Sequence, residues 1–127
     1  MVALVIDDKL YVANCGDSKA VLIRETEGDD GKKFESINVS TTFNANKSYE
    51  KTRLKEKFPS EANDIVICKR GDPKACYVKG GLMPTRAIGD LRLKLREFNF
   101  HNFDERHGYR NSIPNYTGPY ISAEPDI

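Results

Sequence analysis

The first 23 residues of the chain contain three short apolar runs that are rich in β-branched side chains. These runs occupy residues 2–6, 10–15 and 20–23 and are separated by tight turns. Runs of this length with turns between them predict an antiparallel meander of three strands. Because residues 2–6 are apolar at every position, we expect a central strand that is covered on both faces. The neighbours of such a strand have to come from elsewhere, which predicts that the chain is a piece of a larger fold.

Three further segments have the pattern of strands. Residues 34–39 resemble a fourth strand, residues 65–68 are a short strand or the end of an extended segment, and residues 120–123 resemble the start of another strand. The charged, glycine-containing segment 25–33 predicts the hairpin loop before the fourth strand.

One helix is expected over residues 47–58. Asn46 precedes it and can cap it, because an asparagine side chain can accept hydrogen bonds from the exposed amides of the first turn. Residues three or four apart lie on the same face of a helix and can pack or pair there. The residues expected to do so are Leu54 with Phe58 and Glu50 with Arg53.

The cysteines and histidines indicate no metal site. Three cysteines without CxxC spacing, Cys15, Cys68 and Cys76, predict reduced thiols in an intracellular protein. Cys68 and Cys76 flank a loop and can pair, but the reduced state is favoured. His101 and His107 lie in a polar stretch without a nearby cysteine, so we expect surface histidines and no zinc site.

The charge balance and hydropathy exclude two classes of partner. The chain has 20 lysines and arginines against 19 aspartates and glutamates, whereas nucleic-acid-binding domains usually carry a basic excess. No apolar run approaches the ~20 residues that a membrane helix needs. We therefore expect neither a nucleic acid nor a membrane as partner.

A glycine and an aspartate form a turn directly after the second apolar run. Gly16 permits a backbone conformation that other residues avoid, and it places Asp17 at the rim of a sheet. The Asp17 carboxylate can accept hydrogen bonds from the amides of residues 18–20, as in an Asx turn. Alternatively, it can bind Mg²⁺ or Mn²⁺, which prefer oxygen ligands. The residues alone favour the turn.

A second glycine–aspartate pair occurs at Gly89-Asp90, shortly after Arg86. The arginine can clamp a phosphate through two parallel hydrogen bonds, or it can pair with Asp90 or another carboxylate. Asp90 can cap a short helix, and the structural interpretation is the stronger one for both residues. The residues that follow fit a helix with Leu91, Leu95 and Phe98 facing inward, or a strand in which residues 91, 93 and 95 alternate.

Three segments together resemble the metal-dependent, type 2C Ser/Thr protein phosphatases. Residues 10–22 (LYVANCGDSKAVL) resemble the family's "ANxGDSRAVL" hairpin, and residues 81–90 (GLMPTRAIGD) resemble its "SRAxGD" segment. Residues 121–127 (ISAEPDI) resemble its "SAEPEV" strand. Residues 44–61 and 113–120 are further similar to the pyruvate dehydrogenase phosphatase branch, which carries a long insertion between the last two segments.

The resemblance implies an α+β fold, with two antiparallel sheets packed face to face and helices on the outer sides. Residues 1–127 would form the central part of one catalytic domain whose N- and C-terminal parts are missing, and the fold would be incomplete in this chain. Residues 97–119 would be an insertion loop. An incomplete sheet has open edges, through which we expect the chain to associate with itself.

The resemblance also implies an activity: hydrolysis of phosphoserine or phosphothreonine in a phosphoprotein by a water that two Mg²⁺ or Mn²⁺ ions activate. Asp17 matches a metal-binding position of the family. Gly16, Arg86, Gly89 and Asp90 match segments that support the site, and no catalytic side chain is implied in this chain.

The family's "DGHGG", "DGxWD" and "DN" segments, which supply the core metal ligands, have no counterpart in this sequence. The core ligands would therefore lie outside the chain, and we expect the chain to be inactive alone and its parent protein to be active. The alternative is a pseudophosphatase that acts as an interaction module. The compartment would be intracellular, either cytoplasm or mitochondrion.

Overall fold

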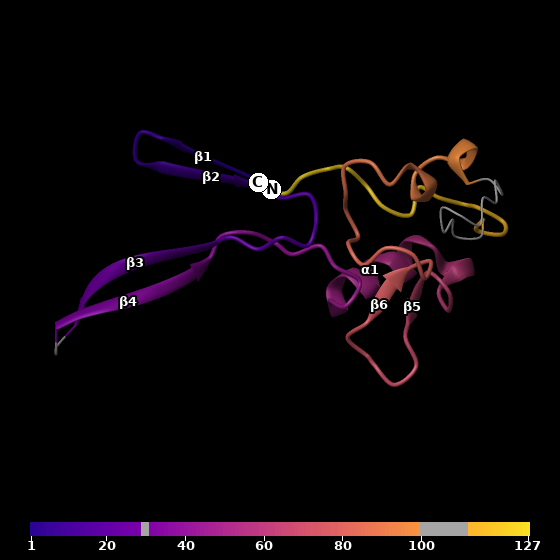
Figure 1. The fold of residues 1–127 in the computed structure, drawn as a ribbon, viewed down its shortest axis with the longest axis horizontal. Helices are drawn as coiled ribbons and strands as arrows, with labels where there is room; N and C mark the ends of the chain where they lie inside the picture. Colours follow the sequence, from indigo (N-terminus) through magenta and orange to yellow (C-terminus); the bar gives the residue numbers. More distant parts are fainter. Residues whose placement is uncertain (29–30, 100–111) are drawn as a thin grey trace, which may run out of the picture.

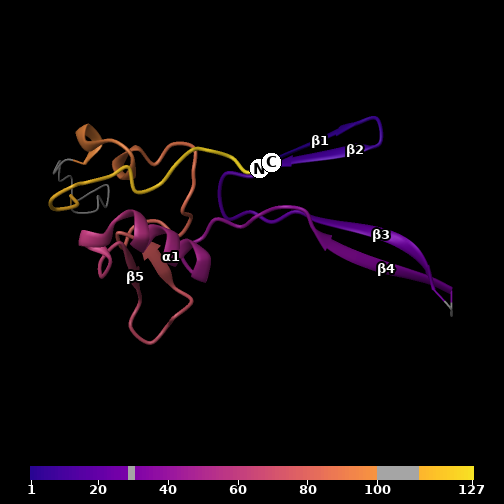
Figure 2. The same cartoon turned by 180° about the vertical axis from the view of Figure 1, so that it is seen from behind.

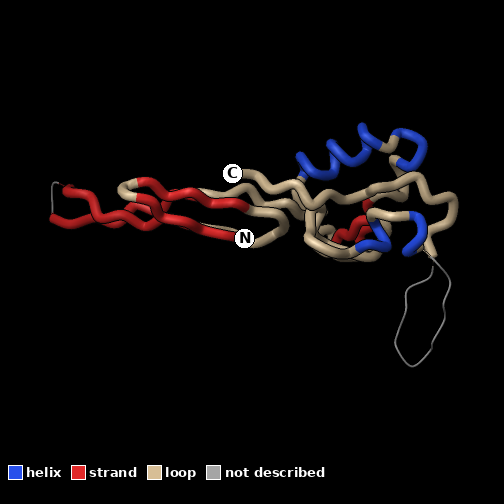
Figure 3. The backbone as a smooth tube through the Cα atoms, turned by 90° about the horizontal axis from the view of Figure 1, so that it is seen from above, coloured by secondary structure: helices blue, strands red, loops and turns tan. Residues whose placement is uncertain are grey.

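Two hairpins extend to one side of a packed region in the computed structural model, which describes residues 1–28, 31–99 and 112–127 (Figure 1). The view from behind shows the same arrangement, with both ends of the chain beside the first hairpin (Figure 2). Seen from above, the strands of the hairpins lie at one end of an elongated molecule and the helices at the other (Figure 3).

The elements are short, and four strands precede the helix in the chain. The strands are β1 (Val2–Ile6), β2 (Lys9–Ala13), β3 (Val21–Gly28), β4 (Gly31–Asn38), β5 (Val66–Cys68) and β6 (Cys76–Val78). The helix is α1 (Ser48–Lys57), and three single 3₁₀ turns are η1 (Pro59–Glu61), η2 (Leu91–Leu93) and η3 (Arg96–Phe98). The described residues thus combine helices with three two-stranded antiparallel sheets. They do not by themselves form the expected pair of sheets packed face to face.

β1 and β2 pair from Val2↔Ala13 to Ile6↔Lys9 around a tight turn. All five residues of β1 are exposed, so the expectation of a strand covered on both faces is wrong for this structure. The physical reason is that none of the described segments covers β1, whereas Val12 of the paired strand β2 is 9% exposed.

β3 pairs with β4 rather than with β2, so the expected three-stranded meander is also wrong. The pairing runs from Val21↔Asn38 to Gly28↔Gly31 and includes most of the segment expected to be a loop. Opposite charges face each other across it: Arg24 Nη2 lies 2.7 Å from Glu35 Oε2, and a second ion pair lies nearer the hairpin end. Such cross-strand pairs favour strand pairing in a polar sequence.

α1 covers the core of the packed region, as the sequence predicts. Leu54 and Phe58 are 0% and 8% exposed and pack together with aliphatic and aromatic side chains from β5, β6 and the C-terminal segment. The prediction that Asn46 caps the helix is wrong, because the N-cap is Lys47 and no side chain caps it. The Asn46 side chain instead accepts a hydrogen bond from the amide of Cys76 at 2.9 Å.

β5 and β6 place Cys68 directly opposite Cys76, and the two form a disulfide with their Cα atoms 3.9 Å apart. The expectation of three reduced thiols is therefore wrong, and Cys15 is the free cysteine in the structure. Spacing along the chain did not reveal the pair, because the strand register decides which cysteines meet.

The segment after Asp90 forms the 3₁₀ turn η2 and not a regular helix or strand. Leu93 is the buried leucine, at 3% exposure, whereas Leu91, Leu95 and Phe98 are 40–43% exposed. The helical alternative, in which these three residues face inward, is therefore wrong, since a 3₁₀ turn has a different period from an α-helix.

The C-terminal segment 112–121 returns to the core. The Asn99 side chain forms two hydrogen bonds with the backbone of Ile113. Asn99 Nδ2 donates to the Ile113 carbonyl (2.8 Å), and the Ile113 amide donates to Asn99 Oδ1 (2.7 Å). Residues 120–123 form an isolated bridge to Arg86 at Ser122 instead of a strand. Part of the expected insertion loop 97–119, together with both histidines, lies outside the described residues. Within the described ranges, no helix is both long enough and apolar enough to cross a membrane.

Candidate functional site

A buried asparagine shapes the turn that carries Asp17. Asn14 is 1% exposed and lies directly after β2. Its Nδ2 group donates to the carbonyls of Gly16 (3.0 Å), Ser18 (3.0 Å) and Thr41 (2.7 Å). One side chain therefore holds both ends of the turn and ties the turn to the segment after β4.

Asp17 itself is exposed, and one of its carboxylate oxygens is held from the side. Asn44 donates a hydrogen bond from Nδ2 to Asp17 Oδ2 at 3.1 Å. The described amides of residues 18–20 make no hydrogen bond to this carboxylate, and the Ala20 amide donates instead to Ser40 Oγ at 2.8 Å. The interpretation of Asp17 as the acceptor of an Asx turn is thus not what the structure shows.

Gly16 brings the two sequence motifs into contact. Its φ is 155°, and a Cβ at this position would lie 3.5 Å from the carbonyl oxygen of Arg86. The Gly16 carbonyl accepts from the Phe43 amide at 2.9 Å, and the Phe43 carbonyl accepts from the Thr85 amide at 3.0 Å. The segment around Phe43 therefore joins the Asp17 turn to the segment that contains Arg86.

Arg86 uses its guanidinium to connect segments. Its Nη1 donates to the carbonyl of Glu124 at 2.8 Å, and its guanidinium carbon lies 3.7 Å from the centre of the Phe43 ring. The backbone beside it is held as well, because the Ala87 amide donates to the Ser122 carbonyl at 2.9 Å. Pairing between Arg86 and Asp90, one alternative left open by the sequence, does not occur among the described contacts.

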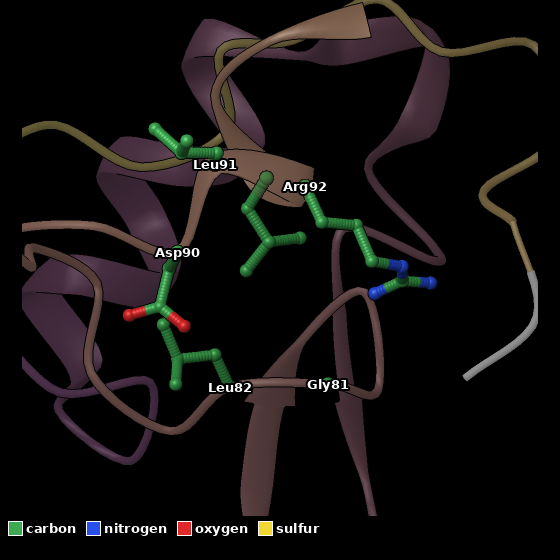
Figure 4. Close-up of a pocket in the computed structure, with 6 residues that line it drawn as sticks. Gly81, Leu82, Asp90, Leu91 and Arg92 are labelled. Carbon is green, nitrogen blue, oxygen red and sulfur yellow. The ribbon is translucent and has the colours of Figure 1, made fainter. Parts of the chain in front are cut away.

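Gly89 and Asp90 lie outside the group formed by Gly16, Asp17 and Arg86. Both have positive φ angles, 89° and 48°, and they lead into η2. Asp90 lines a hollow of about 260 Å³ together with Gly81, Leu82 and residues 91–93. Figure 4 shows its carboxylate pointing toward Leu82, whereas the Arg92 guanidinium points to the far side. The structure thus brings Gly16, Asp17 and Arg86 together and leaves Asp90 outside this group.

A buried carboxylate lies behind the Arg86 segment, and its contact with that segment was not expected from the sequence. Glu50 is 2% exposed and accepts hydrogen bonds from Arg53 Nε (2.9 Å), Arg53 Nη2 (2.7 Å) and the Thr85 hydroxyl. Burial raises the pKa of Glu50, but the hydrogen bonds from Arg53 and Thr85 outweigh it and hold the pKa below its ordinary value. The only signal in the sequence is that Glu50 precedes Leu54 by one helical turn, on the buried face.

The surroundings of Asp17 are suited to one carboxylate oxygen that binds a hard cation. The second carboxylate oxygen, Oδ1, has no hydrogen-bond partner in the part of the chain that the structure describes, so it is available to an ion. The same part contains no group of three or more histidine, cysteine, aspartate or glutamate side chains able to hold a metal. Mg²⁺ and Mn²⁺ need several oxygen ligands, so a complete centre requires groups from outside these residues.

Comparison with known proteins extends the resemblance to the whole chain. The family model described as protein phosphatase 2C matches residues 1–127. "Probable protein phosphatase 2C 78" of Oryza sativa subsp. japonica is 36% identical over 127 residues, which cover 100% of this chain and 30% of that protein. "Probable protein phosphatase 2C 63" of Arabidopsis thaliana is 35% identical over 128 residues, covering 100% and 32%.

The pyruvate dehydrogenase phosphatase branch is also among the relatives. "[Pyruvate dehydrogenase [acetyl-transferring]]-phosphatase 1, mitochondrial" of Homo sapiens is 34% identical over 129 residues, which cover 93% of this chain and 22% of that protein. The chain therefore spans a third or less of the length of these curated relatives.

Proposed function

Because the chain belongs to the protein phosphatase 2C family, we propose that the protein containing it is a Mg²⁺- or Mn²⁺-dependent Ser/Thr phosphatase. The observation that carries this proposal is the position of Asp17. Its carboxylate lies on an exposed turn, with one oxygen held by Asn44, where the two family motifs meet. This is the arrangement expected for a cation ligand presented at the rim of a larger site.

The proposal assigns residues 1–127 to the central part of one catalytic domain. In the complete domain, the β1–β2 and β3–β4 hairpins would be extended by strands from outside the chain into a sandwich of two sheets. The exposure of their apolar side chains supports this, since large exposed apolar surfaces usually mark contact sites. Residues 97–119 would be an insertion loop.

Bound Mg²⁺ or Mn²⁺ would supply an activated water for attack on the phosphorus of a phosphoserine or phosphothreonine. The contribution of this chain would be the Asp17 carboxylate as an outer ligand. Gly16 and Arg86 would support it by closing the turn against the neighbouring segments, and Gly89 with Asp90 would support the loop that follows. The core ligands would come from outside the chain, so the chain alone is expected to be inactive.

The substrate would be a phosphoprotein, and the compartment would be intracellular, either cytoplasm or mitochondrion. The mitochondrial alternative has support in the name of the human relative, a mitochondrial pyruvate dehydrogenase phosphatase. We expect no nucleic acid or membrane partner. In isolation, the chain is expected to associate with itself through the open edges and apolar faces of its hairpins.

A second candidate function is a pseudophosphatase, an interaction module that retains the sheets without the metals. The described residues do not gather three metal-ligating side chains at any point, which is compatible with both candidates. Sequence outside residues 1–127 distinguishes the two candidates, because an Asp-Gly pair upstream favours the enzyme.

The experiment measures phosphate release from a phosphothreonine peptide in the presence of Mn²⁺, using the 127-residue chain and a longer protein that contains it. We expect turnover by the longer protein and none by the chain. Turnover by the chain alone would show that the core ligands are not outside it. An inactive longer protein that retains its fold would favour the pseudophosphatase.

A further inference from the structure

Asn46 and Asn44 connect strand β6 to the Asp17 carboxylate through three hydrogen bonds. The backbone amide of Cys76 donates to Asn46 Oδ1 at 2.9 Å, and the backbone amide of Asn46 donates to Asn44 Oδ1 at 2.8 Å. Asn44 Nδ2 then donates to Asp17 Oδ2 at 3.1 Å. Cys76 and Asp17, which lie 59 positions apart in the chain, are therefore connected through Asn46, by its side chain and its backbone, and through the Asn44 side chain.

The position of Asn44 is determined on both sides of the residue. Its neighbour Phe43 donates its amide to the Gly16 carbonyl at 2.9 Å, and its neighbour Ala45 donates its amide to the Met83 carbonyl at 2.8 Å. Asn44 is itself 9% exposed, and both polar atoms of its side chain are hydrogen-bonded. The amide that faces Asp17 thus has little freedom to rotate away.

Asp17, in contrast, has no other side-chain support among the described residues. A carboxylate on an exposed turn loses rotational freedom when it binds a cation, and this loss weakens binding. A hydrogen bond that already fixes one oxygen removes part of that loss and aims the other oxygen at the ion. Groups that orient metal ligands in this way typically contribute about 10- to 100-fold to metal affinity.

We propose that Asn44 is a positioning residue that orients the Asp17 carboxylate for a divalent cation, and that Asn46 holds Asn44 in place. The inference rests on the proposed function, because it requires that Asp17 binds a cation in the complete protein. It adds a role for two residues outside the sequence motifs, and it links the α1–β6 region to the cation site.

The test uses Mn²⁺ alone as the probe and a longer protein that contains this chain. Electron paramagnetic resonance measures the concentration of free Mn²⁺ during a titration, which gives the affinity of each Mn²⁺ site. The site that is present in the wild type and absent in Asp17→Asn is assigned to Asp17. Asn44→Ala is expected to weaken this site about 10-fold, with a smaller loss for Asn46→Ala. Asn63→Ala, at an exposed turn residue, is the matched control and is expected to leave the affinity unchanged.

Two further measurements separate positioning from a structural role. The thermal midpoint of the metal-free protein is expected to change little in Asn44→Ala, and phosphate release is expected to recover at saturating Mn²⁺. If Asn44→Ala does not fold, Asn44→Ser keeps a polar side chain that is too short to reach Asp17 and is measured in the same way.

The outcomes distinguish this inference from the proposed function. Wild-type activity on the phosphothreonine peptide tests the function by itself. An active wild type whose Asp17 site has the same Mn²⁺ affinity in Asn44→Ala would overturn the positioning role only. The positioning role would also be overturned if Asn44→Ala and Asn63→Ala lost Mn²⁺ affinity equally, or if no Mn²⁺ site depended on Asp17.

Discussion

The hydroxyl of Thr85 donates a hydrogen bond to the buried carboxylate of Glu50, 35 positions earlier in the chain. Arg53, one turn further along α1, pairs with the same carboxylate. The contact joins the helix to the residue that directly precedes Arg86. The candidate site is therefore held from behind by a charged group with almost no contact with solvent.

Glu50→Gln is expected to reduce the free energy of unfolding by about 2 kcal/mol near neutral pH, because the hydrogen bonds to a charged acceptor are weakened. The pKa of Glu50 is held below its ordinary value of 4.5, so its stabilising contribution is present above that pH and is lost as the pH falls through the lower, folded-state pKa. Urea denaturation as a function of pH measures this. The difference between wild type and variant is expected to shrink in acid, and Glu56→Gln, at an exposed position of α1, serves as control.

Lys79→Met is expected to destabilise the chain by about 3 kcal/mol, because it leaves the Glu61 carboxylate, which is only 13% exposed, without its cationic partner. The Lys79 side chain is 5% exposed; it forms an ion pair with Glu61 and lies 2.9 Å from Asp64. Its ammonium also lies 5.1 Å from the centre of the Tyr120 ring. Chemical denaturation measures the effect, and Lys55→Met, on the exposed face of α1, is the control. Equal stabilities of the two variants would show that the cluster contributes nothing.

Protein purified without reductant is expected to show one reactive thiol after denaturation, that of Cys15, and three after reduction. Opening the disulfide between Cys68 and Cys76 is expected to cost about 2–3 kcal/mol, because it closes a short loop. Ellman titration counts the thiols, and denaturation with and without reductant measures the stability. Three thiols in the unreduced protein would contradict the pairing.

Val5→Lys and Ile23→Lys are each expected to shift the isolated chain from associated species toward monomer. Both side chains are about two-thirds exposed, at 69% and 67%, and a lysine on a strand opposes edge-to-edge and face-to-face association. Sedimentation velocity over a range of concentrations measures the distribution. Thr52→Lys introduces the same charge on α1 and is expected to have no effect, so an equal shift in this control would indicate a general effect of charge.

Local patterns predicted the elements that depend on nearby residues. The helix at residues 47–58 was expected almost as observed, because the apolar period and Pro59 act within one or two turns. The strands at residues 2–6, 34–39 and 65–68 also occur close to the expected bounds. The family was evident from three short motifs, since these carry specific glycines and charged residues in a defined order.

Contacts between distant segments were not predictable in this way. The partner of β3, the pairing of Cys68 with Cys76 and the use of Asn46 depend on how strands and loops cross in space. The same applies to the candidate site: the residues alone favoured Asp17 as a turn acceptor, and the resemblance favoured it as a cation ligand.

The sequence by itself determined the local elements, the family and the choice of Asp17, because these follow from side-chain type and short-range spacing. Only the tertiary structure decided that Asn44 holds Asp17, that Gly16 meets Arg86 and that Glu50 supports Thr85. Hydrogen bonds between residues tens of positions apart form only where the backbone brings their atoms within about 3 Å, and no periodic pattern encodes that distance.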